Sequence, residues 1–155
     1  MDVMLYRIID DYLPELEHKE IWNYCNFTQY NLAEADTEET HQKIVSGLDI
    51  RNLSNFPRTL EGEELSTAHI NYYVPNEHSS FHQDSDRSEA LTLIYFPCPT
   101  YDINEGGATE LIINDEIVGV RSKANRALIF KSVLWHRATP FHTKQRFTVA
   151  LKYGS

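Results

Sequence analysis

Three side chains with metal-ligating chemistry, His82, Asp84 and His136, are the residues whose types and spacing point most directly to a reaction centre. Two imidazoles and one carboxylate can occupy one face of an octahedral metal ion and leave the opposite face for other ligands. Zinc accepts similar ligands with one position left open, so the three residues alone do not distinguish iron from zinc. The sequence therefore predicts a metal site and leaves the metal undecided.

The local pattern separates His82 and Asp84 from a second pair with the same spacing, His18 and Glu20. Residues two apart point to the same face of a strand but not of a helix. The stretch around His18 has helical spacing, whereas His82 follows a strand-like segment. We therefore assign His82 and Asp84 to the site, with His136 brought back by intervening antiparallel strands. The histidines expected to lie outside the ligand set are His18, His41, His69, His78 and His142.

Arg146 begins the last predicted strand, ten residues after His136. Alternation places Arg146, Thr148, Ala150 and Lys152 on one face of this strand and Phe147, Val149, Leu151 and Tyr153 on the other. A buried arginine needs an anionic partner, and residues 137–155 contain no Asp or Glu. The partner is therefore a distant acid, solvent, or the carboxylate of a ligand held in bidentate fashion. Spacing alone does not choose among these.

The elements that position these residues are mainly strands. The predicted strands are 5–9, 65–74, 89–96, 109–113, 116–120, 127–131, 136–141 and 146–153, with a hairpin turn at 114–115. An apolar stripe at helical spacing near the N-terminus comprises Leu16, Ile21, Trp22, Cys25 and Phe27. Residues 31–62 have no clear pattern: 42–48 could form a helical turn or two, 52–57 reads as loop, and the whole stretch is either mobile or a substrate lid. This succession favours an all-β barrel or sandwich with N-terminal helical support.

Composition limits the class of protein. The length of 155 residues favours a single domain that spans residues 1–155. The net charge of −9 argues against nucleic-acid partners. Lys and Arg concentrate after residue 115, yet strands from both halves are expected to interleave, so the asymmetry in sequence need not be one in space. Two cysteines form no disulfide framework, and no apolar run reaches the ~20 residues of a membrane span. With no signal-peptide pattern at the N-terminus, we expect a cytoplasmic protein without a membrane partner.

Several segments carry a family resemblance in addition to the spacing of His82, Asp84, His136 and Arg146. They are residues 6–13, 71–73, 91–96, 105–111, 130–140 and 146–148. Together they resemble the 2-oxoglutarate- and Fe(II)-dependent dioxygenases, especially the prolyl 4-hydroxylase-like branch, over most of the chain. Residues 71–73, Asn-Tyr-Tyr, are also similar to the related alkylation-repair dioxygenases.

The resemblance implies a mainly β double-stranded β-helix, a jelly-roll or cupin-like barrel with supporting N-terminal helices and iron at its mouth. It implies that His82, Asp84 and His136 are catalytic ligands of Fe(II). It also implies that Arg146 forms a salt bridge with the C5 carboxylate of the cosubstrate 2-oxoglutarate.

A tyrosine on the strand before the metal-binding pair is a further contact that the resemblance implies for 2-oxoglutarate. Tyr73, nine residues before His82, fits this place better than Tyr72, and Tyr95 is a second candidate. The alternative for each tyrosine is a half-buried barrel residue without a role in binding.

The activity implied is that of a 2-oxoglutarate- and O2-dependent hydroxylase that releases succinate and CO2, with ascorbate as an optional reductant. A prolyl residue of a peptide or protein is the expected substrate; a free amino acid, another small molecule or a nucleobase stays open. A non-catalytic cupin-like module that binds a metal or small ligand is the alternative. A zinc hydrolase is a third hypothesis for the function.

Overall fold

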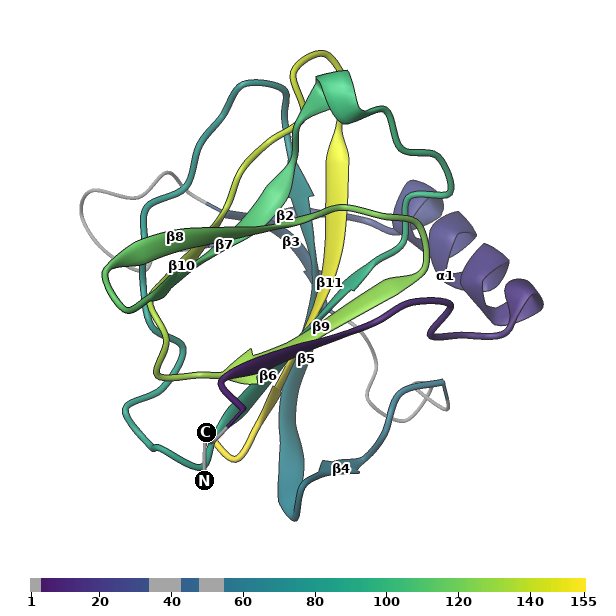
Figure 1. Ribbon diagram of the computed structural model, residues 1–155. Coiled ribbons are helices and arrows are strands. Elements are labelled where there is room, and N and C mark those ends of the chain that lie inside the picture. The colour runs from purple at the N-terminus through teal and green to yellow at the C-terminus, as the bar shows by residue number, and fades with distance from the viewer. Residues whose placement is uncertain (1–3, 34–42, 48–54) are drawn as a thin grey trace.

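The computed structural model of the protein describes residues 4–33, 43–47 and 55–155. Its elements, in chain order, are β1 (Tyr6–Ile9), α1 (Glu15–Phe27), β2 (Asn31–Ala33), β3 (Lys43–Gly47), β4 (Thr59–Leu60), β5 (Glu63–Tyr73), β6 (Leu91–Phe96), the 3-10 helix η2 (Ile103–Glu105), β7 (Ala108–Ile113), β8 (Glu116–Arg121), β9 (Arg126–Lys131), β10 (His136–Ala138) and β11 (Arg146–Tyr153). They build two curled antiparallel sheets (Figure 1).

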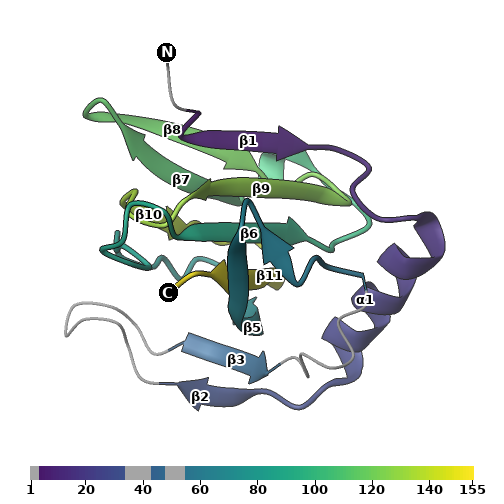
Figure 2. The ribbon, with the colours of Figure 1, turned by 90° about the horizontal axis from the view of Figure 1, so that it is seen from below.

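The larger sheet has eight strands in the order β1-β9-β6-β11-β5-β3-β2, with β4 paired to β5. The C-terminal strands β9 and β11 lie between strands that precede residue 115, which confirms the predicted interleaving. Helix α1 lies beside this sheet and carries the chain from its β1 edge to its β2 edge (Figure 2). The last strand, β11, is thus held centrally between β6 and β5.

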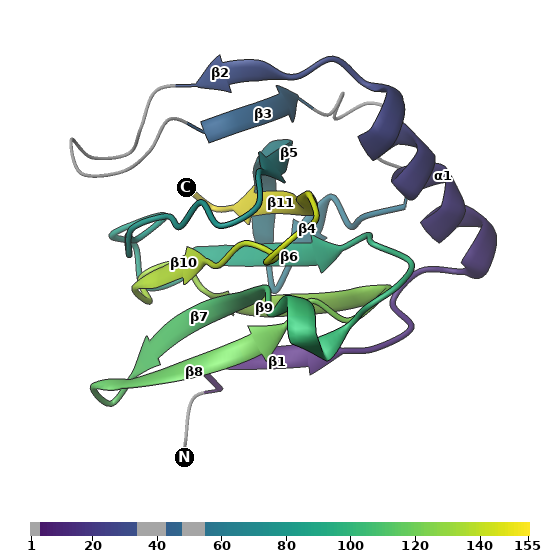
Figure 3. The same cartoon turned by 90° about the horizontal axis from the view of Figure 1, so that it is seen from above.

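The smaller sheet has three strands in the order β10-β7-β8. Asn114 and Asp115 connect β7 to β8 with φ values of 52° and 63°, the left-handed conformation that a two-residue type I′ hairpin requires. Asn and Asp adopt it more readily than other non-glycine residues, so the predicted hairpin forms without glycine. Strands β7 and β8 lie on the side of the molecule nearest β1 and β9 (Figure 3).

Two apolar clusters hold these layers together. The first lies between the larger sheet and α1, and includes Ile21, Cys25, Tyr95, Phe147 and Val149. The second fills the space between the two sheets, with Ile94, Phe96, Leu128, Phe130 and Ala150 from the larger sheet and Leu111 and Val120 from the smaller. The two facing antiparallel sheets, with both faces of the central strands β6, β9 and β11 buried, confirm the predicted mainly β, double-stranded β-helix architecture with helical support on one side.

The N-terminal region departs from the prediction in detail. Helix α1 buries Ile21 and Cys25 as expected, but Leu16 and Phe27 are exposed, so its apolar stripe is narrower than the spacing suggested. The helical turns predicted for 42–48 are wrong, because β3 occupies Lys43–Gly47 and pairs with β5. Residues 34–42 and 48–54, half of the proposed lid, lie outside the described residues. Within the described part, no helix is long and apolar enough to span a membrane.

Candidate metal centre

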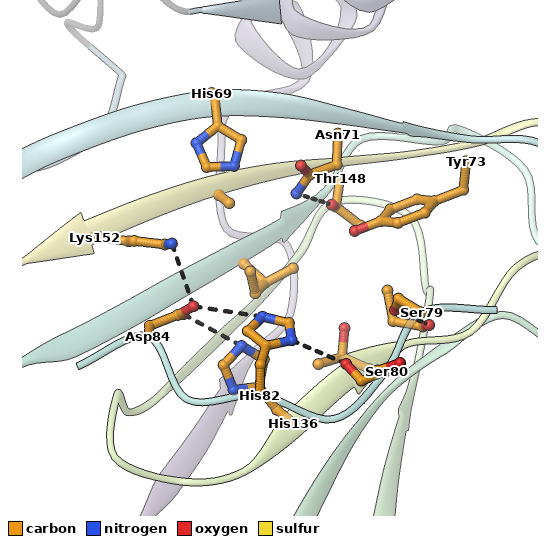
Figure 4. A pocket seen from close by; sticks show the side chains of 14 residues that line it. His69, Asn71, Tyr73, Ser79, Ser80, His82, Asp84, His136, Thr148 and Lys152 are labelled. Atoms are coloured by element: carbon orange, nitrogen blue, oxygen red, sulfur yellow. Dashed lines mark hydrogen bonds and ion pairs between the residues drawn. The ribbon is translucent and has the colours of Figure 1, made fainter. Parts of the chain in front are cut away.

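His82, Asp84 and His136 come together at one end of the space between the sheets (Figure 4). One potential ligand atom from each lies within 4.8 Å of the others. A single antiparallel bridge sets this geometry, because the His82 amide donates to the His136 carbonyl at 3.0 Å and the His136 amide donates back at 2.9 Å. The strand expected around His82 is limited to this bridge, and Asp84 lies in the loop that follows.

Backbone carbonyls orient both imidazoles. The Nδ1 atom of His82 lies 3.0 Å from the Ser80 carbonyl, and that of His136 lies 2.9 Å from the Leu134 carbonyl. A carbonyl only accepts, so in each ring Nδ1 carries a proton and Nε2 is the nitrogen that can bind a metal. Both Nε2 atoms point to Asp84, at 3.6 Å from Oδ1 for His82 and 3.3 Å from Oδ2 for His136. This orientation is typical of histidines that bind a metal.

Asp84 is held in its ionised form although its side chain is buried. Its Oδ2 accepts a hydrogen bond from the Thr92 hydroxyl at 2.8 Å, and its Oδ1 lies 3.3 Å from the Lys152 ammonium. Burial alone would raise the pKa of Asp84. Contact with His136, the charge of Lys152 and the Thr92 hydroxyl outweigh burial and hold this pKa well below its usual range.

The donor set fits a divalent metal ion. Bonds of about 2.1 Å at right angles place neighbouring ligand atoms about 3 Å apart. The two Nε2–carboxylate separations of 3.6 and 3.3 Å are close to this value. Two neutral imidazoles and one carboxylate suit Fe(II) and leave other positions open.

The pocket at this site is lined by both sheets and by the loop between β5 and β6, and the central strands β5 and β11 supply three residues each. Its lining residues are His69, Asn71, Tyr73, Ser79, Ser80, His82, Asp84, Ile94, Thr109, His136, Ala138, Thr148, Ala150 and Lys152. The alternation predicted for the last strand is confirmed, because Thr148, Ala150 and Lys152 face the pocket while Phe147, Val149, Leu151 and Tyr153 belong to the opposite cluster.

Arg146 lies on the pocket-facing side of β11 but is completely buried. Its guanidinium carbon lies 5.5 Å from the centroid of the Tyr73 ring and 5.6 Å from that of Phe96. None of its three guanidinium nitrogens has a hydrogen-bond partner among the described residues. Burial lowers the pKa of Arg146, and the nearby Tyr73, Cys98 and Tyr101 oppose this shift only in part.

A buried guanidinium without an acidic partner has the chemistry to bind a carboxylate ligand. Arginine remains protonated under ordinary conditions, so the charge cannot be removed by losing a proton. A planar guanidinium can donate two parallel hydrogen bonds to a carboxylate. The residues present therefore fit a dicarboxylate cosubstrate that has one end at the metal and the other at Arg146.

The two candidate tyrosines have different positions. Tyr73 lines the pocket next to Arg146, where the sequence placed it. Tyr95 does not: it is buried in the cluster beneath α1, and its hydroxyl donates to Asn125 Oδ1 at 2.6 Å. The proposal of Tyr95 as a cosubstrate contact is therefore corrected. Every residue of β6 is buried, so alternation could not show that Ile94, not Tyr95, faces the pocket.

Sequence reasoning missed the pocket roles of several residues. His69 and Asn71 alternate with Tyr73 on β5, so the signal for them was the strand periodicity. Lys152 was placed on the face of Arg146 but not beside Asp84. Thr92 had no signal, because its contact with Asp84 joins β6 to a loop.

The family description that matches residues 68–153 is the 2OG-Fe(II) oxygenase superfamily. The chain belongs to this superfamily. The matched region spans more than half of the chain and contains all three candidate ligands and Arg146. No curated protein sequence matches the chain.

Solved structures share the fold at low sequence identity. A prolyl-4-hydroxylase from Pseudomonas putida has a TM-score of 0.75 at 14% identity, over 97% of this chain and 92% of that one. A prolyl hydroxylase from Trichoplax adhaerens, in complex with a hypoxia inducible factor peptide fragment, has a TM-score of 0.74 at 15% identity, over 97% and 83%. The α-ketoglutarate-dependent carbocyclase SnoK from nogalamycin biosynthesis has a TM-score of 0.71 at 13% identity, over 96% and 79%.

Membership of the superfamily identifies the chain as an oxidoreductase that uses Fe(II) and 2-oxoglutarate. It also disfavours the cupin-like binding module without turnover and the zinc hydrolase. The similar structures include more than one kind of reaction, so the fold alone does not name the substrate.

Proposed function

We propose that the enzyme hydroxylates a prolyl residue of a peptide or protein, with Fe(II) held by His82, Asp84 and His136. Arg146 binds the C5 carboxylate of 2-oxoglutarate, and Tyr73 forms part of the same subsite. The observation that carries this proposal is the completely buried, unpartnered guanidinium of Arg146 in the same interior as the three ligands.

The bound Fe(II) would supply the oxidising chemistry: O2 and 2-oxoglutarate would be consumed, succinate and CO2 released, and a C–H bond of the substrate hydroxylated. The protein contributes binding and orientation. The carbonyls of Ser80 and Leu134 fix the imidazoles so that Nε2 faces the metal position. Arg146 fixes the far end of the cosubstrate, which limits the ways in which its other end can reach the metal.

The pocket walls support a reaction shielded from water. Ile94 and Ala138 present apolar surface beside the ligands, while Ser79 and Ser80 supply polar groups from the loop before His82. The hydroxyl of Ser79 donates to the Ala138 carbonyl at 2.8 Å, so this loop is anchored to β10 next to His136. A partly apolar, anchored wall suits an uncharged carbon centre.

Likeness to two prolyl hydroxylases over 97% of the chain supports a prolyl substrate. The experiment that tests it incubates the iron-loaded protein in air with 2-oxoglutarate, ascorbate and two libraries, one of proline-containing peptides and one of small metabolites. Mass spectrometry then seeks a product heavier by one oxygen atom, together with stoichiometric succinate.

A hydroxylated peptide is the expected result, and Asp84→Ala should abolish it with the succinate. Oxidation in the metabolite library alone would refute the prolyl substrate but keep the oxygenase. The site itself would be refuted if the protein, titrated anaerobically with Fe(II) and 2-oxoglutarate, gave no metal-to-ligand charge-transfer band and then formed no succinate in air.

A further inference from the structure

A lysine beside the proposed ligands has no role in the function described so far. Lys152 stands near the end of β11, and its Nζ lies 3.3 Å from Asp84 Oδ1. Its side chain is one-quarter exposed, at 24%, and points into the pocket (Figure 4). Asp84 is its one acidic partner within the part of the chain that the structure describes.

Lys152 and Arg146 bracket the pocket from opposite ends of the same strand face. They are six residues apart on β11, about 20 Å between Cα atoms at the rise of an antiparallel strand. Arg146 lies beside Tyr73 at one end, and Lys152 lies beside the metal ligand Asp84 at the other. Two long cationic side chains thus lie on the same face of β11, one beside the candidate ligands and the other in the buried region near Tyr73.

The position of Lys152 has opposite consequences for the two binding steps. An ammonium in contact with Asp84 competes with a divalent cation for the same carboxylate and repels that cation, because like charges at short range are unfavourable. A dicarboxylate that reaches the metal brings negative charge to the same place. The ammonium then attracts this charge and can donate a charge-assisted hydrogen bond to it.

We propose that Lys152 couples the two binding steps: it weakens binding of the divalent metal alone and strengthens binding of the cosubstrate carboxylate at the metal. The inference rests on the proposed function of His82, Asp84, His136 and Arg146. In thermodynamic terms the lysine makes metal and 2-oxoglutarate binding more cooperative, and the coupling is reciprocal. The protein thereby retains metal best when the cosubstrate is present.

The test measures two affinities without turnover, with Mn(II) in place of Fe(II). Free Mn(II) is counted by electron paramagnetic resonance to give the metal Kd, and calorimetric titration of the Mn(II)-loaded protein gives the Kd for 2-oxoglutarate. The variants are Lys152→Met, Lys152→Gln and Lys152→Arg. The matched control is Lys123→Met, which removes a lysine 3.6 Å from Asp10 on the surface. Thermal unfolding verifies that each variant is folded.

For Lys152→Met and Lys152→Gln we expect tighter Mn(II) binding, and 2-oxoglutarate binding weakened at least about tenfold, the loss of one charge-assisted hydrogen bond. Lys152→Arg, which keeps the charge, should stay close to wild type in both affinities, as should Lys123→Met. Unchanged 2-oxoglutarate affinity in the folded neutral variants would overturn the inference. Weaker Mn(II) binding in these variants would also overturn it, because Lys152 would then only support Asp84. If the wild type itself binds Mn(II) but not 2-oxoglutarate, the proposed function fails as well, and the two failures are thereby distinguished.

Discussion

Replacing Arg146 with methionine should make the metal-free, cosubstrate-free protein more stable. The guanidinium is fully buried and has no hydrogen-bond partner among the residues that the structure describes, so it carries the desolvation cost of an uncompensated charge, about 3–5 kcal/mol. Contacts with the Tyr73 and Phe96 rings offset about 1–2 kcal/mol of this cost. Methionine keeps most of the apolar stem, so the net gain in the free energy of unfolding should be about 1–4 kcal/mol.

The same substitution should abolish stabilisation by the cosubstrate. With Mn(II) bound, 2-oxoglutarate at one hundred times its Kd should stabilise the wild type by about 2.7 kcal/mol. Arg146→Met lacks the cation that pairs with the C5 carboxylate, so 2-oxoglutarate at the same concentration should leave its unfolding free energy unchanged. Denaturant unfolding with and without 2-oxoglutarate measures both effects.

Arg126→Met is the matched control. Arg126 donates to Asp10 from Nε at 2.7 Å on β9, away from the pocket. A second bond runs from Nη2 to Asp10 Oδ2 at 3.2 Å, and the Arg126 side chain is 12% exposed, so its loss should lower the free energy of unfolding by about 1–3 kcal/mol, opposite in sign to Arg146→Met, and leave cosubstrate stabilisation intact. Two results would refute the reasoning: an Arg146→Met protein that is less stable than the wild type without ligands, or one that 2-oxoglutarate still stabilises fully.

Three further predictions concern Thr92, the two candidate tyrosines and Asp84. Thr92→Val removes the hydroxyl that donates to Asp84 and should weaken Mn(II) binding about 10- to 100-fold, measured by metal titration, with unchanged affinity as the contrary result. Tyr95→Phe should leave the 2-oxoglutarate Kd unchanged but lower the free energy of unfolding by about 1–3 kcal/mol through the lost bond to Asn125. Tyr73→Phe, in contrast, should raise the 2-oxoglutarate Kd. The reverse pattern of Kd values would assign Tyr95 to the site. The pKa of Asp84 is lowered in the folded protein, so its stabilising contribution is present above the unfolded pKa of about 3.9 and is lost as pH falls below it. Metal-free wild type should therefore lose unfolding free energy in acid more steeply than Asp84→Asn, and equal slopes would contradict the assignment.

The orientation of β11 was predictable because every second residue of this strand is apolar. Phe147, Val149, Leu151 and Tyr153 alternate with residues that differ in polarity, and only one register of a strand buries them together. The side of the barrel occupied by Arg146 and Lys152 followed from that pattern. The three candidate ligands were proposed from residue type, and in the structure one bridge joins His82 to His136.

Other features depend on contacts that local pattern does not encode. All six residues of β6 are buried, with Leu91, Leu93 and Tyr95 in the first cluster and Ile94 and Phe96 in the second, so burial of the whole strand hides the side of Tyr95 from that of Ile94. The stretch Lys43–Gly47 is a strand because it pairs with β5, a tertiary interaction that overrides weak local preference. Lys152 lies beside Asp84 because β11 is paired with β6 and β5. The spacing of residues along the sequence does not show that this pairing brings β11 close to the loop of Asp84.

The unsatisfied buried atoms extend the argument for the cosubstrate position from Arg146 to Asn71. Among the described residues five buried side-chain atoms lack a hydrogen-bond partner, and four of them belong to Arg146 and Asn71. These residues lie on paired strands, since Arg146 is opposite Tyr73 and Thr148 is opposite Asn71. A folded protein rarely leaves such groups unpaired, because each buried orphan lowers stability. Their concentration along one face of β5 and β11, between Arg146 and the metal ligands, is what a site completed by a polar, anionic ligand requires.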